Sequence, residues 1–337
     1  MNEIMFERYL EVNCSSSLDT GRYLLWFRIL MITLSMIALV IIFLGIFLNS
    51  LVIITILSHL KKSIPYQLMV WIAINDNFRL LADMIDFGIH LLESFAENIP
   101  RFIMKPLAIA HAMDLIFETY GSNASKYVLT QLTVIQYISI SRPFYMPRAS
   151  VINAIAALLT IINLLMCIPN YYLLQVQYCI EQGKFKLSAR FNSVWYYRAY
   201  VESFLHPIFP MVIVLIVSIL MIRIIKRSNK LRKEMKSESL SITRSILKLN
   251  LIFIICNIPH ILYSTLMFFG YTPEFPFVAR NIIIYMADFS TCFNCSSRFV
   301  IYIFSDHRFK ASFYKVFHVR TNSKYLTSMT ESRVIKM

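Results

Sequence analysis

The amino-acid sequence predicts an all-α membrane protein, in which seven transmembrane helices form a bundle and a short amphipathic eighth helix follows. Of the 337 residues, 57% are hydrophobic and only 15% are charged, whereas an ordinary soluble domain contains about 25% charged residues. Seven windows contain the roughly 20 mostly apolar residues that a helix needs to cross a bilayer core about 30 Å thick. These observations exclude an ordinary cytosolic enzyme.

The seven windows differ in how plainly they predict a membrane span. The first, fourth, fifth and sixth are nearly free of charge, whereas the second, third and seventh contain charged residues. Because lipid offers backbone groups no hydrogen-bond partner, each window is expected to be helical. The predicted bundle covers residues 29–303, and its windows span approximately 29–57, 66–92, 106–140, 151–173, 203–225, 247–270 and 277–303.

The distribution of Lys and Arg predicts which helix ends lie in the cytoplasm. With Arg223 and Lys248 at the window edges included, the odd-numbered connections and the C-terminal tail contain 20 Lys and Arg and four Asp and Glu. With Arg280 included in the same way, the first segment and the even-numbered connections contain ten basic and nine acidic residues. Because cytoplasmic connections are enriched in Lys and Arg, we expect an extracellular amino terminus (1–28) and a cytoplasmic tail (319–337), in a multi-pass plasma-membrane protein. No cleavable signal is evident, so the first window is expected to target the chain.

Two features of the predicted outer segments bear on covalent modification. Asn13 begins an Asn-Cys-Ser acceptor for glycosylation, which agrees with the predicted orientation. Cys14 and Cys179 are expected outside, where disulfides form, and both a bridge between them and two free thiols remain open.

Chemistry of other kinds is not indicated by the sequence. No metal-ligand spacing, phosphate-binding loop or nucleophile motif occurs, so we expect no metal, no cofactor and no enzymatic activity. The basic stretch from Lys226 to Lys236 lacks interleaved aromatic residues. It therefore favours a cytoplasmic loop near the membrane over nucleic-acid binding.

Five short motifs lie in the residue ranges 45–52, 72–76, 137–144, 253–259 and 294–310. Their order and spacing resemble those of the rhodopsin-like (class A) G-protein-coupled receptors. The resemblance covers about residues 30–318 and implies a receptor that acts on a heterotrimeric G protein and on arrestin. The loose motifs, the low Gly content and the many Phe and Tyr residues look most similar to divergent invertebrate peptide receptors and nematode chemoreceptors. The motifs resemble, in chain order, GxxxNxxV (45–52), LAxxD (72–76), YxxIxxP[LF] (137–144), FxxCWxP (253–259) and NSxxNPxxY with the basic eighth helix (294–310).

The acidic residues of the second, third and seventh windows suggest a cationic ligand. The resemblance implies that these helices line a ligand cavity, and Glu118 matches the position of the Asp that binds ammonium groups in amine receptors. We expect Glu118, Asp114, Asp288 and Asp83 to bind an extracellular peptide or amine, such as a neuropeptide or a chemosensory cue. A peptide is favoured because Asn257 replaces the Trp of the amine branch. The alternative is that these acids pair within the protein, for instance Asp83 or Asp86 with Arg101 or Lys105.

A second group of polar residues is predicted inside the bundle. The resemblance places a sodium site at positions matched by Asp76, Ser125, Asn294 and Arg298, near Asn49 of the first motif. A guanidinium and a sodium ion would compete for one carboxylate, so we expect Arg298 to pair with Asp76 as a tethered replacement for sodium. In the alternative, Arg298 extends to the cytoplasmic interface and Asp76 pairs with Arg79, one turn away.

The resemblance also implies an activation switch formed by Gln136, Tyr137, Phe253, Pro259 and Tyr302. Gln136 stands where the family has an Arg that contacts the G protein, so the usual ion pair between the third and sixth helices cannot form. High basal activity and weakened or absent G-protein coupling both remain open. The family's disulfide from the third helix also lacks one cysteine, because His111 occupies that position; this motivates the Cys14–Cys179 pairing.

The segment 304–318 has the pattern of a helix lying on the inner leaflet. Its apolar residues Phe309, Phe313, Val316 and Phe317 recur at helical spacing, and its cations fall on other faces. A helix packed on the bundle is the alternative. Two rivals to a signalling receptor remain: a receptor homologue that has lost signalling, and a transporter or channel subunit whose intramembrane charges form a conduction path.

Overall fold

The computed structural model describes residues 25–60, 63–95, 101–142, 147–181, 184–191, 193–227, 237–268 and 277–317. This described part contains seven long helices: α2 (Leu25–Thr55), α3 (Ile64–Phe95), α4 (Arg101–Ser141), α5 (Ala149–Leu173), α6 (Ser193–Arg227), α8 (Ser237–Phe268) and α9 (Phe277–Ser305). The π-helical segment η2 (Ile56–Leu60) extends α2, and the short helix α10 (His307–Val316) follows α9. All seven hydrophobic windows are therefore helical.

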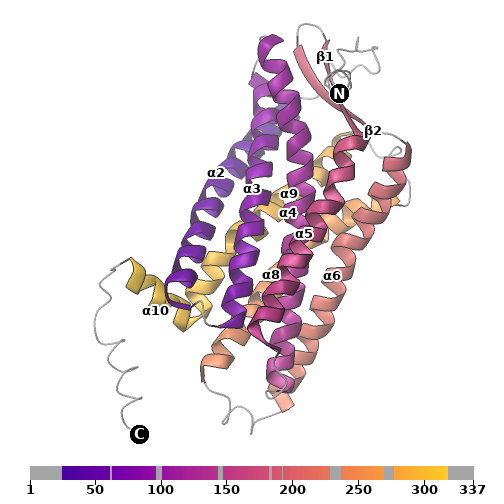
Figure 1. The fold of residues 1–337 in the computed structure, drawn as a ribbon. Helices are drawn as coiled ribbons and strands as arrows, with labels where there is room; N and C mark the ends of the chain where they lie inside the picture. Colours follow the sequence, from indigo (N-terminus) through magenta and orange to yellow (C-terminus); the bar gives the residue numbers. More distant parts are fainter. Residues whose placement is uncertain are drawn as a thin grey trace, which may run out of the picture.

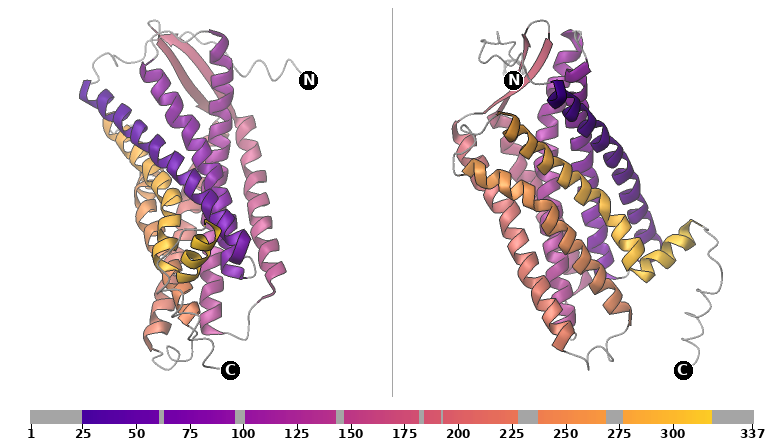
Figure 2. Two further views of the ribbon diagram at one scale, coloured as in Figure 1. Left: turned by 90° about the vertical axis from the view of Figure 1, so that its left-hand side faces the viewer. Right: turned by 180° about the vertical axis from the view of Figure 1, so that it is seen from behind.

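The long helices lie side by side along one direction and form a closed bundle (Figures 1 and 2). Helix α2 packs against both α3 and α9, which joins the first and last long helices. The other contacts run from α3 to α4, from α4 to α6, from α6 to α8 and from α8 to α9, while α5 packs on α4. Helix α3 also reaches α9, so these two helices face each other inside the bundle.

Four helices in the described part are long and apolar enough to cross a membrane by length and composition. They are the segments Ile29–Leu60, Ala149–Met166, His206–Lys226 and Ile242–Tyr263. These correspond to the first, fourth, fifth and sixth hydrophobic windows, the ones nearly free of charge in the sequence. The prediction of a membrane protein is supported at this level, and the remaining long helices are the ones that carry buried charges.

The surface of the bundle is apolar and its interior contains polar groups. Ionic and amide side chains such as Asp76, Arg298 and Asn49 are buried, while large apolar side chains point outward from the helices. A soluble protein rarely exposes apolar patches of this extent, whereas lipid solvates them. Exposed members include Val40, Phe43, Phe47, Leu81, Leu158, Leu165, Ile216, Ile258, Phe293 and Val300.

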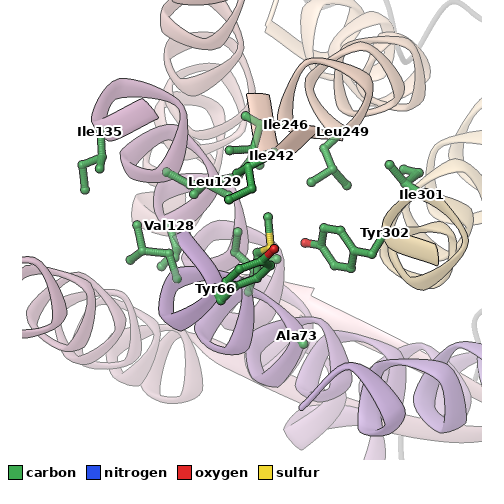
Figure 3. Packing of buried hydrophobic residues seen from close by; sticks show 14 of the residues in the cluster. Tyr66, Ala73, Val128, Leu129, Ile135, Ile242, Ile246, Leu249, Ile301 and Tyr302 are labelled. Atoms are coloured by element: carbon green, nitrogen blue, oxygen red, sulfur yellow. The ribbon is translucent and has the colours of Figure 1, made fainter. Parts of the chain in front are cut away.

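The largest group of buried apolar residues fills the half of the bundle nearest α10. Figure 3 shows residues of α3, α4, α8 and α9 meeting there, with Tyr302 pointing from α9 into the cluster. A smaller cluster formed by α2, α3 and α9 lies farther along the bundle and includes Leu80, Phe87 and Cys292. Helices α3 and α9, which carry most of the buried charges described below, contribute to both clusters.

A two-stranded antiparallel hairpin was not expected from the sequence. Strand β1 (Leu174–Glu181) pairs with β2 (Lys184–Phe191) in a register that sets Leu174 opposite Phe191 and Glu181 opposite Lys184. The all-α prediction thus holds for the bundle but omitted this connection between α5 and α6. The sequence does contain the signal, because apolar residues alternate with polar ones through β2 (Phe185, Leu187, Ala189) after a glycine.

The short helix α10 is fixed to the bundle at its first turn. Asp306 caps the helix: its Oδ1 accepts hydrogen bonds from the backbone N–H groups of Arg308 (2.9 Å) and Phe309 (3.3 Å). The Tyr66 hydroxyl of α3 donates to Asp306 Oδ2 at 2.8 Å. Burial raises the pKa of the Asp306 carboxyl, and these hydrogen bonds oppose that rise.

The predicted eighth helix differs from the observed one at its start. Residues 304 and 305 belong to α9, and α10 begins at His307 because Asp306 ends one helix and caps the next. Phe309 is buried and packs against the rings of Phe299 and Tyr302, with centroid distances of 6.0 and 5.6 Å. Around this end of the bundle, the exposed cations among the residues whose side chains are described are Arg142, Arg148, Arg223, Lys226, Arg244, Lys248, Lys310 and Lys315.

Candidate functional site

An ion pair at the centre of the bundle joins α3, α4 and α9. Arg298 Nε lies 2.8 Å from Asp76 Oδ2. Ser125 of α4 bridges the same two residues, since its hydroxyl donates to Asp76 Oδ1 at 2.7 Å and accepts from Arg298 Nη2 at 2.9 Å. The Asp76 side chain is 0% exposed and that of Arg298 only 4%, so neither charge reaches bulk solvent. The predicted Asp76–Arg298 pair is therefore present.

A second ionic group lies one to two turns farther along α3. Arg79 contacts Asp83 through two nitrogen atoms, Nη2 to Oδ1 at 2.8 Å and Nε to Oδ2 at 3.1 Å. The same Nη2 is 3.6 Å from Asp288 Oδ1 of α9, and the Asp288 side chain is 27% exposed. Cys292 of α9 donates its Sγ–H to Asp83 Oδ2 at 3.0 Å. We call Asp76, Arg79, Asp83, Asp288 and Arg298 the charged cluster.

Helical spacing explains why the charged cluster forms between α3 and α9. Asp76, Arg79 and Asp83 are separated by three and four residues, which places them on one face of α3. That face can lie deep in the bundle because helices approach closely there. A Cβ atom on Gly121 of α4 would lie 2.7 Å from the backbone nitrogen of Arg79, so only glycine permits this crossing of α3 and α4.

A group of uncharged polar residues joins α8 to α4 and α6 nearer the α10 end. Gln136 Nε2 of α4 donates to Thr243 Oγ1 of α8 at 2.8 Å. Two turns farther along α8, Asn250 Nδ2 donates to Ser218 Oγ of α6 at 2.8 Å, and Asn250 Oδ1 is 3.0 Å from Thr133 Oγ1 of α4. All five residues are buried. We call Gln136, Thr243, Thr133, Asn250 and Ser218 the neutral cluster.

The residues predicted for the internal network are only partly brought together. Asp76, Ser125 and Arg298 contact one another, and Asn49 Nδ2 donates to the adjacent backbone carbonyl of Cys295 at 3.3 Å. Asn294 is buried one turn before Arg298 on α9, and no hydrogen bond to this group is found for it among the described residues. The alternative pairing of Asp76 with Arg79 is not observed, because Arg79 contacts Asp83 and Asp288.

The predicted ligand-binding residues fall into two sets. Asp83 is buried against Arg79, so its charge is neutralised within the protein, although by a different cation from the Arg101 and Lys105 that the sequence suggested. Asp288 makes a longer contact to the same guanidinium and remains partly exposed. Asp114 and Glu118 belong to α4, but their side chains lie outside the described part of the structure.

Three of the predicted activation residues belong to the two clusters: Gln136 to the neutral cluster, and Phe253 and Tyr302 to the large apolar cluster. Gln136 makes an uncharged contact to Thr243 of α8. Phe253 and Tyr302 are buried in the apolar cluster, and Tyr137 packs against its edge. Pro259 lies within α8, where it interrupts the backbone hydrogen bonds of the helix.

The covalent modifications stay predictions. Asn13 and Cys14 lie outside the described residues, and Cys179 is described only as part of β1, without its side chain. Three other cysteines, Cys256, Cys292 and Cys295, are free and buried. Within the described segments, no group of three or more His, Cys, Asp or Glu side chains is arranged to hold a metal ion.

Sequence reasoning missed the partners of Gln136 and the whole Thr133–Asn250–Ser218 group. The available signal was weak: single polar residues in the otherwise apolar windows 203–225 and 247–270, of which Ser218 and Asn250 are examples. The chain matches no known protein-family model and no curated protein.

Proposed function

We propose that this chain is a rhodopsin-like receptor of the plasma membrane, with seven membrane-spanning helices and an extracellular amino terminus. Its ligand is an extracellular cationic peptide or amine, and its cytoplasmic end acts on a heterotrimeric G protein and on arrestin. Binding shifts the bundle between an inactive and an active arrangement. The motifs that resemble this family and the helical bundle with its apolar outer surface support the proposal.

The neutral cluster is the observation that carries the proposal. A receptor needs a helix that can separate from its neighbours at moderate cost, and a net contribution of about 1 kcal/mol per neutral hydrogen bond meets this need. Gln136–Thr243 and the two bonds of Asn250 hold α8 in this way to α4 and α6. They lie at the end of the bundle that exposes basic side chains, and this end is cytoplasmic in the proposed orientation.

The Asp76–Arg298 pair gives the proposed receptor a covalently tethered internal cation. In the proposed mechanism this guanidinium takes the place that sodium has in related receptors, so signalling does not depend on sodium. Replacement of extracellular sodium by N-methylglucamine should leave ligand potency unchanged. A steep sodium dependence would contradict the tethered-cation role.

In the proposed receptor, Glu118 and Asp114 bind the cationic ligand, and Asp288 provides a third contact. Asp83 is the least suited of the four predicted acids, because Arg79 already neutralises it through two close contacts. Asp288 has a longer contact and an exposed fraction that leaves it available to a ligand from the outer side.

The charged cluster favours one alternative function, a transporter or channel subunit. Ionisable groups inside a membrane bundle often mark an ion or substrate path. A second alternative is a receptor homologue without G-protein coupling, which the Gln136 substitution favours. Neither alternative accounts for the ordered family motifs as well as the receptor proposal.

A ligand panel with three readouts tests the proposal. Cells expressing the chain would be exposed to biogenic amines and to peptides with basic residues, and G-protein activation, arrestin recruitment and membrane current would be recorded. We expect a cationic member to activate the G protein and recruit arrestin. Glu118→Gln should weaken its potency about tenfold, equivalent to about 1.4 kcal/mol, at equal surface expression.

The outcomes separate the alternatives. A current without G-protein activation would favour the transporter or channel, and arrestin recruitment alone would favour the homologue without coupling. Basal second-messenger levels of the wild type and Gln136→Arg decide the question of resting activity. A silent wild type would exclude high basal activity.

A further inference from the structure

We infer that Arg79 is a shared cation that exchanges between Asp83 and Asp76, so that the two buried ion pairs of the charged cluster form one coupled unit. The inference concerns the bundle itself and goes beyond the proposed function, because it holds whether or not the chain is a receptor. It rests on the positions of three residues on α3 and two on α9.

The spacing on α3 places Arg79 between two carboxylates. Asp76 precedes it by three residues and Asp83 follows it by four, so each lies on the same helix face at neighbour distance. Cα–Cβ bonds of a helix tilt toward its N-terminus, which for Arg79 is the direction of Asp76. The long arginine side chain can therefore reach either carboxylate by rotation about its own bonds.

The present arrangement is set by competition between two guanidinium groups. Arg298 occupies Asp76 at 2.8 Å with support from Ser125, and this leaves Arg79 to Asp83 and Asp288. If Arg298 withdraws, Asp76 becomes an unpaired charge at a fully buried position, which costs several kcal/mol. Arg79 is the cation on the same helix face that can remove this cost.

Arg79 can move to Asp76 only by leaving Asp83, so the Asp76–Arg298 and Asp83–Arg79 pairs depend on each other. Asp83 is only 3% exposed and holds Arg79 through two close contacts, so releasing Arg79 costs the free energy of this buried pair. Neutralising Asp83 removes this cost. The structure therefore predicts that loss of charge at Asp83 compensates for loss of charge at Arg298.

The coupling of the two pairs can be tested by comparing the full-length wild type with three variants. Thermal unfolding of detergent-purified wild type, Arg298→Gln, Asp83→Asn and the double variant would be compared. We expect Arg298→Gln to lower the melting temperature strongly and Asp83→Asn alone to lower it moderately. The double variant should melt above Arg298→Gln and recover at least half of its loss, because Arg79 then pairs with Asp76.

Further variants identify the cation that moves. Adding Arg79→Gln to the double variant should abolish the recovery. Lys126 of α4 follows Ser125 in the chain and is also buried, and adding Lys126→Gln should leave the recovery in place. Asp288→Asn in the Arg298→Gln background should give a smaller recovery than Asp83→Asn, since its contact to Arg79 is 3.6 Å.

Each possible outcome decides the inference. The inference is overturned if the double variant loses as much melting temperature as the two single variants together. It is also overturned if Asp83→Asn raises the melting temperature of the wild type as much as that of Arg298→Gln. Recovery that survives Arg79→Gln but not Lys126→Gln would overturn it in favour of Lys126. If Arg298→Gln is too unstable to purify, fluorescent fusions of the variants are compared by size-exclusion chromatography. A monodisperse peak for the double variant then counts as recovery. Absence of that peak overturns the inference.

Discussion

The charged cluster and the neutral cluster are buried in the same bundle, but opening them costs different amounts of free energy. Removing one partner of a buried ion pair leaves a charge unpaired at a cost of about 3–5 kcal/mol. A neutral hydrogen bond contributes about 1 kcal/mol net. The Asp76–Arg298 pair therefore holds α3 and α9 firmly, whereas Gln136–Thr243 holds α8 to α4 more weakly.

Helix backbones also approach each other more closely beside the charged cluster than beside the neutral cluster. Beside the charged cluster, α4 lies so close to α3 at Gly121 that a single methyl group would meet the α3 backbone. The described part of α8 contains no glycine, and its contacts in the neutral cluster are made by the ends of side chains. Lys248 adds a further side-chain contact, from its Nζ to Ser305 Oγ at 2.9 Å. Helix α8 can thus separate from its neighbours without displacing backbone against backbone.

The largest effect is expected when one member of the Asp76–Arg298 pair is removed. Arg298→Met and Asp76→Leu each leave one buried charge unpaired, so each should lower the free energy of unfolding by about 3–5 kcal/mol. The double variant replaces the pair with apolar groups and should lose less than either single variant. Chemical unfolding of the purified protein in detergent measures all three. Arg223→Met, at an exposed arginine of α6, is the control.

If the single variants lost as little free energy of unfolding as Arg223→Met, the buried pair would contribute no more than a surface charge. The contrast between the charged and neutral clusters would then be wrong. A double variant that loses the sum of both single losses would show that its two members act independently.

A smaller effect is expected at the helix crossing beside the charged cluster. In Gly121→Ala the added Cβ would lie 2.7 and 2.9 Å from the backbone N and Cα of Arg79. Because these atoms cannot rotate away, α3 and α4 must separate, at a cost of about 1–3 kcal/mol. Chemical unfolding again provides the measurement.

Gly88→Ala is the matched control for this substitution, since it lies in α3 with nothing within 4 Å of the added carbon. It should stabilise the protein by up to about 1 kcal/mol through helix propensity. If Gly121→Ala behaved like Gly88→Ala, the close approach of α3 and α4 would have no energetic weight.

The contrast between the clusters also explains what could be predicted from the sequence. A charged residue in an apolar window is conspicuous, and its cost requires a partner inside the bundle. The sodium site implied by the family resemblance indicated that Asp76 and Arg298 are such partners. The sequence could not show whether Arg79 pairs with Asp76 or with Asp83, because both acids lie at neighbour spacing from it on one helix. Only the position of Asp288 and Cys292 on α9 shows which side of Arg79 is occupied.

The neutral cluster was not predictable for a different reason. Thr, Ser and Asn in apolar helices commonly bond to their own backbone, as Thr133 Oγ1 does to the Leu129 carbonyl at 2.9 Å while it also lies near Asn250. Its single proton is shared between the two acceptors. Nothing in the sequence distinguishes such a residue from Thr130, which bonds within α4 alone.

The smallest effect is expected for Thr243→Val, which removes one hydrogen bond of the neutral cluster. Valine has nearly the same shape as threonine but removes the oxygen that accepts from Gln136 Nε2 at 2.8 Å. Gln136 is buried, and the loss of one neutral hydrogen bond to it should cost about 1 kcal/mol. Hydrogen exchange of the amides in 242–250 should accelerate about fivefold, the factor that 1 kcal/mol represents. Thr130→Val removes a buried hydroxyl whose bond stays within its own helix, to the Lys126 carbonyl at 2.8 Å, and should leave exchange in 242–250 unchanged. Equal exchange in the two variants would mean that the Gln136–Thr243 bond does not hold α8 in place, because only that bond joins two helices.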